Sequence, residues 1–256
     1  MTDLFSITGK TALVTGGSRG IGLMIARGYV QAGARVYISS RKAEVCMAAA
    51  AELSNIGSCI ALPADLGRQS EVERLATELT AREPKLDILV NNAGATWGGT
   101  VDAFPETGWD KVMDLNVKSV FFLIQKLLPL LERAASAENP ARVINIGSID
   151  GMHTSVFENF SYGASKAAVH HLTRMLSARL AARHITVNAV APGPFATDMM
   201  APMIASMGDA IVNRVPLKRM GEAADAAGIA IFLASAAASF ITGTVIPVDG
   251  GISGAS

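Results

Sequence analysis

Short runs rich in β-branched residues alternate with longer helical patterns along the whole chain. The seven strand-like runs are residues 11–15, 34–39, 58–63, 86–91, 142–147, 185–191 and 245–249. The helical patterns cover residues 21–32, 42–54, 69–82, 105–135, 161–183 and 222–234. Such alternation is typical of a parallel sheet with helices on its faces. The pattern therefore predicts an α/β fold, a Rossmann-like, doubly wound parallel sheet of seven strands flanked by helices.

Nothing in the composition divides the chain. Half of its 256 residues are hydrophobic and the mean hydropathy is +0.35, so it can bury a large core. No linker, repeat or charge block appears, and two small domains would require a break in composition that is absent. We expect one dinucleotide-binding and catalytic domain over residues 1–256. A Pro-, Gly- and Met-rich segment at 192–216 interrupts the alternation of strands and helices.

Charge and targeting signals exclude several classes of protein. Lys+Arg and Asp+Glu number 22 each, which argues against nucleic acid as a partner. No apolar run reaches about 18 residues, and the N-terminus lacks the basic and apolar regions of a secretion signal. Cys46 and Cys59 lack redox or metal-ligand spacing, and the four histidines form no ligand pattern. We expect a cytoplasmic protein with no metal and no membrane insertion.

A glycine-rich turn follows the first predicted strand, with the sequence Thr-Gly-Gly-Ser-Arg-Gly-Ile-Gly over residues 15–22. A strand that enters a helix through glycines lets backbone N–H groups face a pyrophosphate at the helix N-terminus. A side chain at Gly16, Gly20 or Gly22 would block the turn, the approach of the ligand or the packing of helix on strand. The alternative is a plain tight turn, but its place in the first strand–helix unit favours a dinucleotide site.

Tyr162 and Lys166 stand four residues apart in a helical pattern, so both side chains project from one face. Because a neighbouring cation favours phenolate, we expect Lys166 to lower the pKa of Tyr162 from about 10. A phenol of this kind is an acid or base near neutral pH. Ser148 follows the strand 142–147, at the edge of the sheet where ligands bind, and its hydroxyl suits a substrate oxygen. Separately, these residues could be a packed tyrosine, a solvated lysine and a turn-forming serine.

Together these motifs resemble the short-chain dehydrogenase/reductase superfamily, in its T-G-x-x-x-G-x-G turn and its Y-x-x-x-K pair. The resemblance implies that Ser148, Tyr162 and Lys166 are catalytic with Asn116. It also implies a helix distortion at Asn116 that holds a water near Lys166, and a proton relay from Tyr162 through the cofactor ribose and Lys166 to that water. In the family the serine usually precedes the tyrosine by thirteen residues, whereas here the separation is fourteen, so the connecting loop is longer.

Further family markers imply the cofactor site. Asn-Asn-Ala-Gly at 91–94 follows the fourth strand, Asp-Leu at 65–66 follows the third, and Pro-Gly at 192–193 follows the sixth. The cofactor-binding residues that we expect are Gly16, Ser18, Arg19, Gly20, Ile21, Gly22, Arg41, Asp65, Leu66, Asn92, Ala93, Gly94, Tyr162, Lys166, Pro192, Gly193 and Thr197.

The end of the second strand indicates which cofactor binds. An NAD-selective site normally places an acidic residue there to hold the ribose 2′-hydroxyl, but residues 39–42 contain none. Arg41, with Arg19 in the glycine-rich turn, suits a 2′-phosphate, because guanidinium binds phosphate through bidentate, charge-assisted bonds. Two exposed surface arginines are the alternative. We predict NADP(H).

The sequence predicts the substrate less specifically than the cofactor. We expect the segment 194–216 to form a lid, in which Met199, Met200, Met203 and Met207 favour an adaptable apolar pocket, with Trp97, Met152, Phe157 and Phe160 at the same mouth. Some of these side chains could instead pack beneath the lid. The chain resembles 3-oxoacyl-thioester reductases of the rhamnolipid-pathway type, which implies a lipophilic carbonyl substrate and a homotetramer. The alternatives are an NADP-dependent alcohol or polyol dehydrogenase and a non-catalytic NADP-binding regulator.

Overall fold

One parallel sheet forms the centre of the computed structural model, which describes residues 4–155, 157–198 and 200–254. Its strand order is β3-β2-β1-β4-β5-β6-β7, with every pair parallel. The strands are β1 (Thr11–Thr15), β2 (Arg35–Ser39), β3 (Cys59–Ala61), β4 (Ile88–Asn91), β5 (Ala141–Ile146), β6 (Ile185–Pro192) and β7 (Val245–Val248). The order reverses beside β1, which creates the crevice where ligands bind in folds of this type. The predicted fold class is confirmed.

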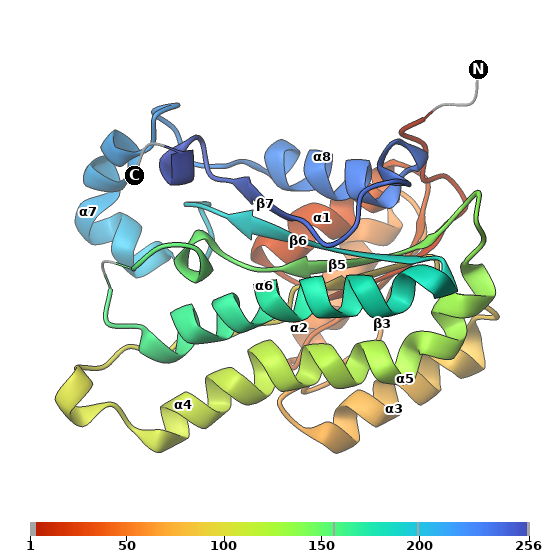
Figure 1. Ribbon diagram of the computed structural model, residues 1–256, viewed down its shortest axis with the longest axis horizontal. Coiled ribbons are helices and arrows are strands. Elements are labelled where there is room, and N and C mark those ends of the chain that lie inside the picture. The colour runs from red at the N-terminus through yellow and green to blue at the C-terminus, as the bar shows by residue number, and fades with distance from the viewer. Residues whose placement is uncertain (1–3, 156, 199, 255–256) are drawn as a thin grey trace.

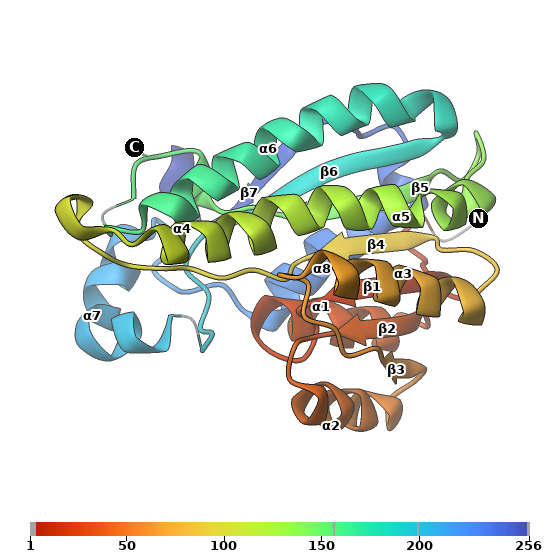
Figure 2. The ribbon, with the colours of Figure 1, turned by 90° about the horizontal axis from the view of Figure 1, so that it is seen from below.

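Helices cover both faces of the sheet (Figures 1 and 2). The helices are α1 (Gly20–Gln31), α2 (Ala43–Ser54), α3 (Gln69–Arg82), α4 (Glu106–Met113), α5 (Ser119–Ala134), α6 (Phe160–Leu180), α7 (Ala201–Arg214) and α8 (Ala223–Ala234). One core cluster joins α1, α2 and α8 to the sheet, and a second joins α3, α5 and α6 to its other face. Helix α7 lies beyond the strand ends and belongs to neither layer (Figure 2).

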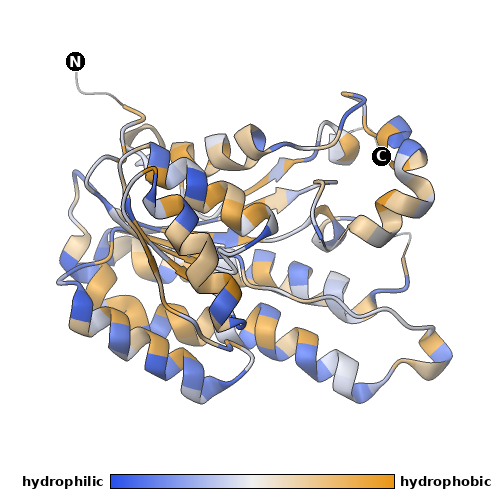
Figure 3. Ribbon diagram, turned by 180° about the vertical axis from the view of Figure 1, so that it is seen from behind, coloured by the Kyte–Doolittle hydropathy of each residue, from blue (hydrophilic) through white to orange (hydrophobic). Residues whose placement is uncertain are grey.

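The pattern of side chains explains these layers. Strands β1, β4, β5 and β6 are buried along their whole length, as expected of strands with helices on both faces. Hydrophobic and polar residues alternate along the helices in Figure 3, and in α3 and α5 mainly apolar residues are buried against the sheet. Among the described residues, no helix is both long and apolar enough to cross a membrane.

Three elements differ from the sequence-based expectation. Strand β3 is shorter than predicted, because only Cys59–Ala61 pairs with β2. The predicted helix 105–135 runs without a gap from Glu106 to Ala134, but it contains a π-helical turn, η2 (Asp114–Lys118), between α4 and α5, and Pro105 is its N-cap residue. The segment 192–216 contains a helix, α7, with a kink at Met207.

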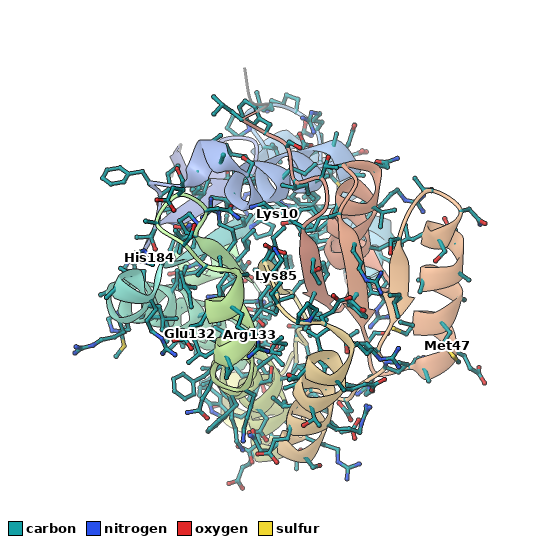
Figure 4. The ribbon with its side chains drawn as sticks, turned by 90° about the vertical axis from the view of Figure 1, so that its right-hand side faces the viewer. Lys10, Met47, Lys85, Glu132, Arg133 and His184 are labelled. Atoms are coloured by element: carbon teal, nitrogen blue, oxygen red, sulfur yellow. The ribbon has the colours of Figure 1, made fainter. Side chains whose placement is uncertain are left out.

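A buried arginine lies near the amino ends of the strands, the end of the molecule that faces the viewer in Figure 4. Arg142 on β5 is 1% exposed and donates hydrogen bonds to the carbonyl oxygens of Pro140 and Ser235, at 2.9 and 3.0 Å. Lys10 donates to the neighbouring carbonyl of Ala234, at 3.3 Å. Both cations therefore lie at the C-terminus of α8, the negative end of its dipole. Burial lowers the pKa of Arg142 to about 10.

Replacing this arginine is expected to destabilise the fold. In Arg142→Met the carbonyls of Pro140 and Ser235 lose their buried donors, and we expect the free energy of unfolding to fall by about 2 kcal/mol. Urea denaturation followed by circular dichroism measures this change. The control is Arg27→Met, which removes an exposed pair with Glu52 and should cost less than about 1 kcal/mol. Equal stability of the wild type and Arg142→Met would contradict the capping role.

Candidate active site

A cleft of about 1380 Å³ lies at the carboxyl ends of the strands. Its walls come from the loops that follow β1, β2, β3, β4, β5 and β6 and from helix α7, and so from nearly every predicted site segment. Binding pockets for small molecules usually measure about 300–1,000 Å³, so this cleft has room for a dinucleotide and a substrate together.

The glycine-rich turn is closely packed. Gly16 has a φ of +65°, a conformation that favours glycine, and a Cβ there would lie 2.6 Å from Nδ2 of Asn92. A Cβ on Gly22 would lie 2.3 Å from the carbonyl oxygen of Gly16. The first residues of α1 therefore approach the turn as closely as backbone atoms allow. Gly22 keeps this geometry without lining the cleft itself, whereas Gly16 and Gly20 both line it.

Hydrogen bonds between Thr15, at the start of this turn, and Asn92, after β4, hold the turn to the neighbouring strand. The side-chain Nδ2 of Asn92 donates to the carbonyl oxygens of Thr15 and Gly16, at 2.9 and 3.2 Å. The Thr15 hydroxyl accepts hydrogen bonds from the backbone N–H groups of Asn92 and Ala93, at 2.9 and 3.0 Å. No role of Thr15 was predicted from the sequence, although this threonine is part of the glycine-rich motif. These bonds fasten the ends of β1 and β4 together beneath the cleft.

Three arginines line the part of the cleft next to the glycine-rich turn and the ends of β2 and β3. Arg19 and Arg41 were predicted, and Arg68, which follows the Asp65–Gly67 turn, was not. Arg19 lies 3.7 Å from the carboxylate of Asp198, but both side chains are at least 70% exposed, so this pair is weak. The hydroxyl of Ser39 is buried at the same edge and has no hydrogen-bond partner among the described residues.

Tyr162 and Ser148 meet at the centre of the cleft. Ser148 lies in the loop after β5, and Tyr162 lies in the first turn of α6. Burial raises the pKa of Tyr162 to about 12, while a hydrogen bond from Ser148 lowers it and the charge of Asp150 raises it. The prediction that Lys166 would lower this pKa is wrong, because the cost of burying a phenolate exceeds the influence of the ammonium group. The Tyr162 hydroxyl is therefore protonated at neutral pH.

Lys166 lies one helical turn beyond Tyr162 and is only 5% exposed. Its Nζ lies 5.5 Å from the centroid of the Tyr162 ring and donates a 2.8 Å hydrogen bond to the carbonyl oxygen of Ile146. Burial lowers the pKa of Lys166 to about 8. The ammonium group thus lies between the end of β5 and the phenol, where it can stabilise negative charge that develops nearby.

Asn116 lies in the π-helical turn η2, so the expected helix distortion is present. Its amide is 1% exposed and exchanges two hydrogen bonds with the backbone of Ala95, at 2.8 and 2.9 Å. It also donates to the hydroxyl of Ser165, at 2.9 Å, on the helix turn between Tyr162 and Lys166. The side chain therefore joins the loop after β4 to α6 and does not line the cleft.

The predicted lid lies against the cleft, although not all predicted aromatic residues do. Met200, Met203 and Met207 line the cleft, as does Phe157 from the facing loop. Met199 lies outside the described residues. Three other side chains were expected at the mouth of the cleft and do not line it. Trp97 packs against Gly108 and Lys111, and Phe160 packs edge-to-face on Phe104. Met152 is 43% exposed.

The structure brings most of the predicted site residues to one cleft. The predicted residues that line it are Gly16, Ser18, Arg19, Gly20, Ile21, Arg41, Asp65, Leu66, Asn92, Ala93, Gly94, Ser148, Tyr162, Lys166, Pro192, Gly193 and Thr197. Among the described residues, no group of three or more His, Cys, Asp or Glu side chains could hold a metal ion. The arrangement can therefore bind an anionic cofactor beside a proton donor.

Comparisons with known proteins agree with this geometry. A family model described as Enoyl-(Acyl carrier protein) reductase matches residues 16–253. The chain is 51% identical to the rhamnolipids biosynthesis 3-oxoacyl-(acyl-carrier-protein) reductase of Pseudomonas aeruginosa, over 98% of this chain and 99% of the relative. The solved Pseudomonas aeruginosa RhlG/NADP active-site complex is similar, with a TM-score of 0.94 and 51% identity, over 98% of this chain and 99% of that one. A gluconate 5-dehydrogenase from Burkholderia cenocepacia, in complex with NADP and tartrate, has a TM-score of 0.91 and 34% identity, over 99% of both chains.

Proposed function

Because this chain belongs to the short-chain dehydrogenase/reductase family, we propose that it reduces the keto group of 3-oxoacyl thioesters with NADPH. The observation that carries the proposal is the meeting of three groups at one point of the cleft. The phenol of Tyr162 and the hydroxyl of Ser148 line the cleft together, close enough for Ser148 to lower the pKa of Tyr162, and the buried ammonium of Lys166 lies one helical turn away. The thioester substrate is suggested by the 51% identical reductase.

Each of these side chains has a distinct task in the reduction. The bound cofactor supplies the hydride. The hydroxyl of Ser148 donates a hydrogen bond to the substrate carbonyl oxygen and stabilises the negative charge that develops there. Tyr162, protonated at neutral pH, transfers its proton to the same oxygen to give the alcohol. The Lys166 ammonium offsets the charge left on the phenol, and Asn116 holds the helix turn that carries both residues.

The cofactor end of the cleft fits an NADP molecule. The close-packed turn before α1 presents backbone N–H groups at a helix N-terminus, where a diphosphate is stabilised. The end of β2 carries no acidic residue, and the unpartnered hydroxyl of Ser39 lies beside Arg41 in the cleft wall. We assign the ribose 2′-phosphate to Arg41 and Arg19, with Arg68 nearby.

We also propose that the segment 194–216 acts as the substrate lid. Met200, Met203, Met207 and Ile211 of this segment line the cleft on both sides of the kink at Met207, so both parts of α7 contribute apolar residues to it. Methionine side chains adapt to ligands of different shape.

A second candidate is an NADP-dependent alcohol or polyol dehydrogenase. It is favoured by the similarity to a gluconate 5-dehydrogenase structure and by the polar wall that His153, Thr154 and Ser155 form in the cleft. This candidate shares the proposed proton donor and differs only in the substrate.

A substrate panel separates the two candidates. The purified protein is mixed with NADPH and either 3-oxoacyl thioesters of increasing chain length or ketones derived from polyols, and the absorbance of reduced nicotinamide is followed. We expect kcat/KM to rise with acyl length and to exceed the polyol-derived values at least about tenfold, as expected from several buried methylene groups. Fast reduction of the polyol-derived ketones, with no reduction of thioesters, would favour the second candidate.

The cofactor assignment gives its own expected result. We expect kcat/KM to be about 100-fold higher with NADPH than with NADH, because two guanidinium groups gain charge-assisted bonds to phosphate. Arg41→Ala should raise KM for NADPH about tenfold and leave KM for NADH unchanged. Arg27→Ala, which alters an exposed arginine on α1 outside the cleft lining, is the matched control. A preference of the wild type for NADH would contradict the assignment.

Several expectations from the sequence stay predictions. These are the homotetramer, the cytoplasmic location, the absence of nucleic-acid partners and the single domain over residues 1–256. Exposed apolar side chains on α5 and α6, such as Phe121 and Met175, are compatible with a contact between subunits.

A further inference from the structure

His170 lies on α6, one helical turn beyond Lys166, and is buried behind the loop 147–151, which carries Ser148. It is 3% exposed, and its Nε2 has no hydrogen-bond partner among the described residues. Burial and the nearby charge of Lys166 lower the pKa of His170 to about 4. A buried histidine without a proton-transfer partner has no evident role in the chemistry, so its position must be explained in another way.

The imidazole fills a space that two glycines leave open. A Cβ on Gly147 would lie 2.1 Å from Nε2 of His170, and a Cβ on Gly151 would lie 2.9 Å from its Cε1. These glycines flank Ser148 in the loop after β5. The loop therefore passes over the ring at two points, and only glycine allows so close an approach.

One hydrogen bond joins the loop to the start of α6, from Nδ2 of Asn159 to the carboxylate of Asp150, at 3.2 Å. The hydrogen bonds that Ser148 itself accepts from the backbone are local. The N–H of Asp150 donates to the Ser148 hydroxyl at 3.2 Å, and the N–H of Gly151 donates to the Ser148 carbonyl at 3.0 Å, but both bonds lie within the loop. Gly147 is joined to β6 through Val190, at 2.7 Å. On the side of α6, Gly151 packs against the helix backbone at Lys166 and Ala167, whereas Gly147, the residue before Ser148, packs against the ring of His170.

We propose that His170 is a positioning residue, whose ring supports the loop 147–151 from below and so holds the Ser148 hydroxyl beside Tyr162. The inference rests on the proposed function of Ser148 as a hydrogen-bond donor to the substrate. The support beneath Gly147 is steric, because Nε2 has no hydrogen-bond partner among the described residues, although a hydrogen bond with the backbone of Gly151 raises the pKa of His170. A side chain of similar shape without polar atoms should therefore replace it.

A double-mutant cycle tests this assignment. His170→Ala empties the space beneath the loop, and we expect kcat for carbonyl reduction to fall at least about tenfold with KM for NADPH unchanged, since small displacements of catalytic groups cost this much. In the Ser148→Ala background the same substitution should change kcat less than about twofold, because the group that it positions is already absent. An equal loss in both backgrounds would overturn the proposal, since His170 would then act through Lys166 or through the fold.

Two further variants complete the experiment. His170→Leu keeps a branched side chain of similar size, and its kcat should stay within about threefold of the wild type. A loss as large as that of His170→Ala would overturn the steric account. His171→Ala is the matched control, because His171 is the next residue on the same helix and is exposed. Its kcat should equal that of the wild type.

Hydrogen exchange separates this inference from the proposed function. We expect the backbone amides of residues 147–151 to exchange at least about tenfold faster in His170→Ala than in the wild type or His171→Ala, because the loop loses its support. This measurement needs no substrate. Unchanged exchange would overturn the positioning role even in an active reductase, whereas faster exchange in a protein that reduces no thioester would leave the role intact and contradict only the proposed substrate.

Discussion

Tyr162→Phe should lower kcat for carbonyl reduction by about a thousandfold, the range expected when a general acid is removed. The substitution deletes one oxygen atom and leaves the ring, so the packing of α6 is kept. The structure places this hydroxyl against Ser148, and its pKa of about 12 means that it carries a proton at neutral pH. No other described tyrosine lines the cleft. The reaction is followed at the absorbance band of reduced nicotinamide.

Another tyrosine of the chain, Tyr37, provides a control for this experiment. Tyr37→Phe removes a buried hydroxyl that donates to Glu83 at 2.6 Å, outside the cleft lining, and should leave kcat unchanged. Binding of NADPH, measured by fluorescence, should stay within about threefold of the wild type in Tyr162→Phe, because the glycine-rich turn is untouched. Retention of kcat in Tyr162→Phe would remove the phenol from the mechanism.

The strands were predicted well because a parallel sheet buries them on both faces. Runs such as Thr11–Thr15 and Ile185–Pro192 consist of apolar residues with only Thr and Asn among them. A glycine follows the first run and a proline ends the second, so their position is visible in the sequence alone. Where a strand is only partly buried, its ends are harder to predict from the apolar pattern of the sequence. Only three residues of the predicted run 58–63 pair with β2, because β3 lies at the edge of the sheet.

Two helical features could not be found from periodicity. Helix α7 carries Pro, Gly and several Met residues and is kinked at Met207, so its composition resembles a loop. The π-helical turn at Asp114–Lys118 contains no proline or glycine and looks like ordinary helix. Only the resemblance of Asn116 to a family residue indicated a distortion there. Such turns depend on tertiary contacts, here the bonds from Asn116 to Ala95 and Ser165.

The electrostatic prediction failed for a related reason. The spacing of Tyr162 and Lys166 showed that they share a helix face, but it could not show how deeply they are buried. Burial raises the pKa of the phenol and lowers that of the ammonium, opposite to what an exposed pair would show. The supporting roles of Thr15 and His170 were also missed, because each depends on contacts between segments that lie far apart in the sequence.

Gly22→Ala should abolish cofactor binding and so activity. Two effects oppose each other at this position. Alanine favours helix by about 1 kcal/mol over glycine, and Gly22 lies in the first turn of α1. However, the new Cβ would lie 2.3 Å from both the carbonyl oxygen of Gly16 and Nδ2 of Asn92. The Gly16 oxygen belongs to backbone and cannot rotate away, so the turn must open.

We expect the Kd for NADPH to rise at least about 100-fold in Gly22→Ala, because the opened turn no longer presents its N–H groups to the diphosphate. Fluorescence titration measures this change, and thermal unfolding reports the fold. Gly228→Ala is the matched control: it lies within helix α8, and a Cβ there meets no atom within 4 Å. That variant gains helix propensity without a clash, so its melting temperature should rise slightly while its Kd stays the same. Because the two substitutions are chemically identical, unchanged NADPH binding by Gly22→Ala would mean that the turn is compliant, and the close packing of Gly16, Gly22 and Asn92 would not explain cofactor recognition.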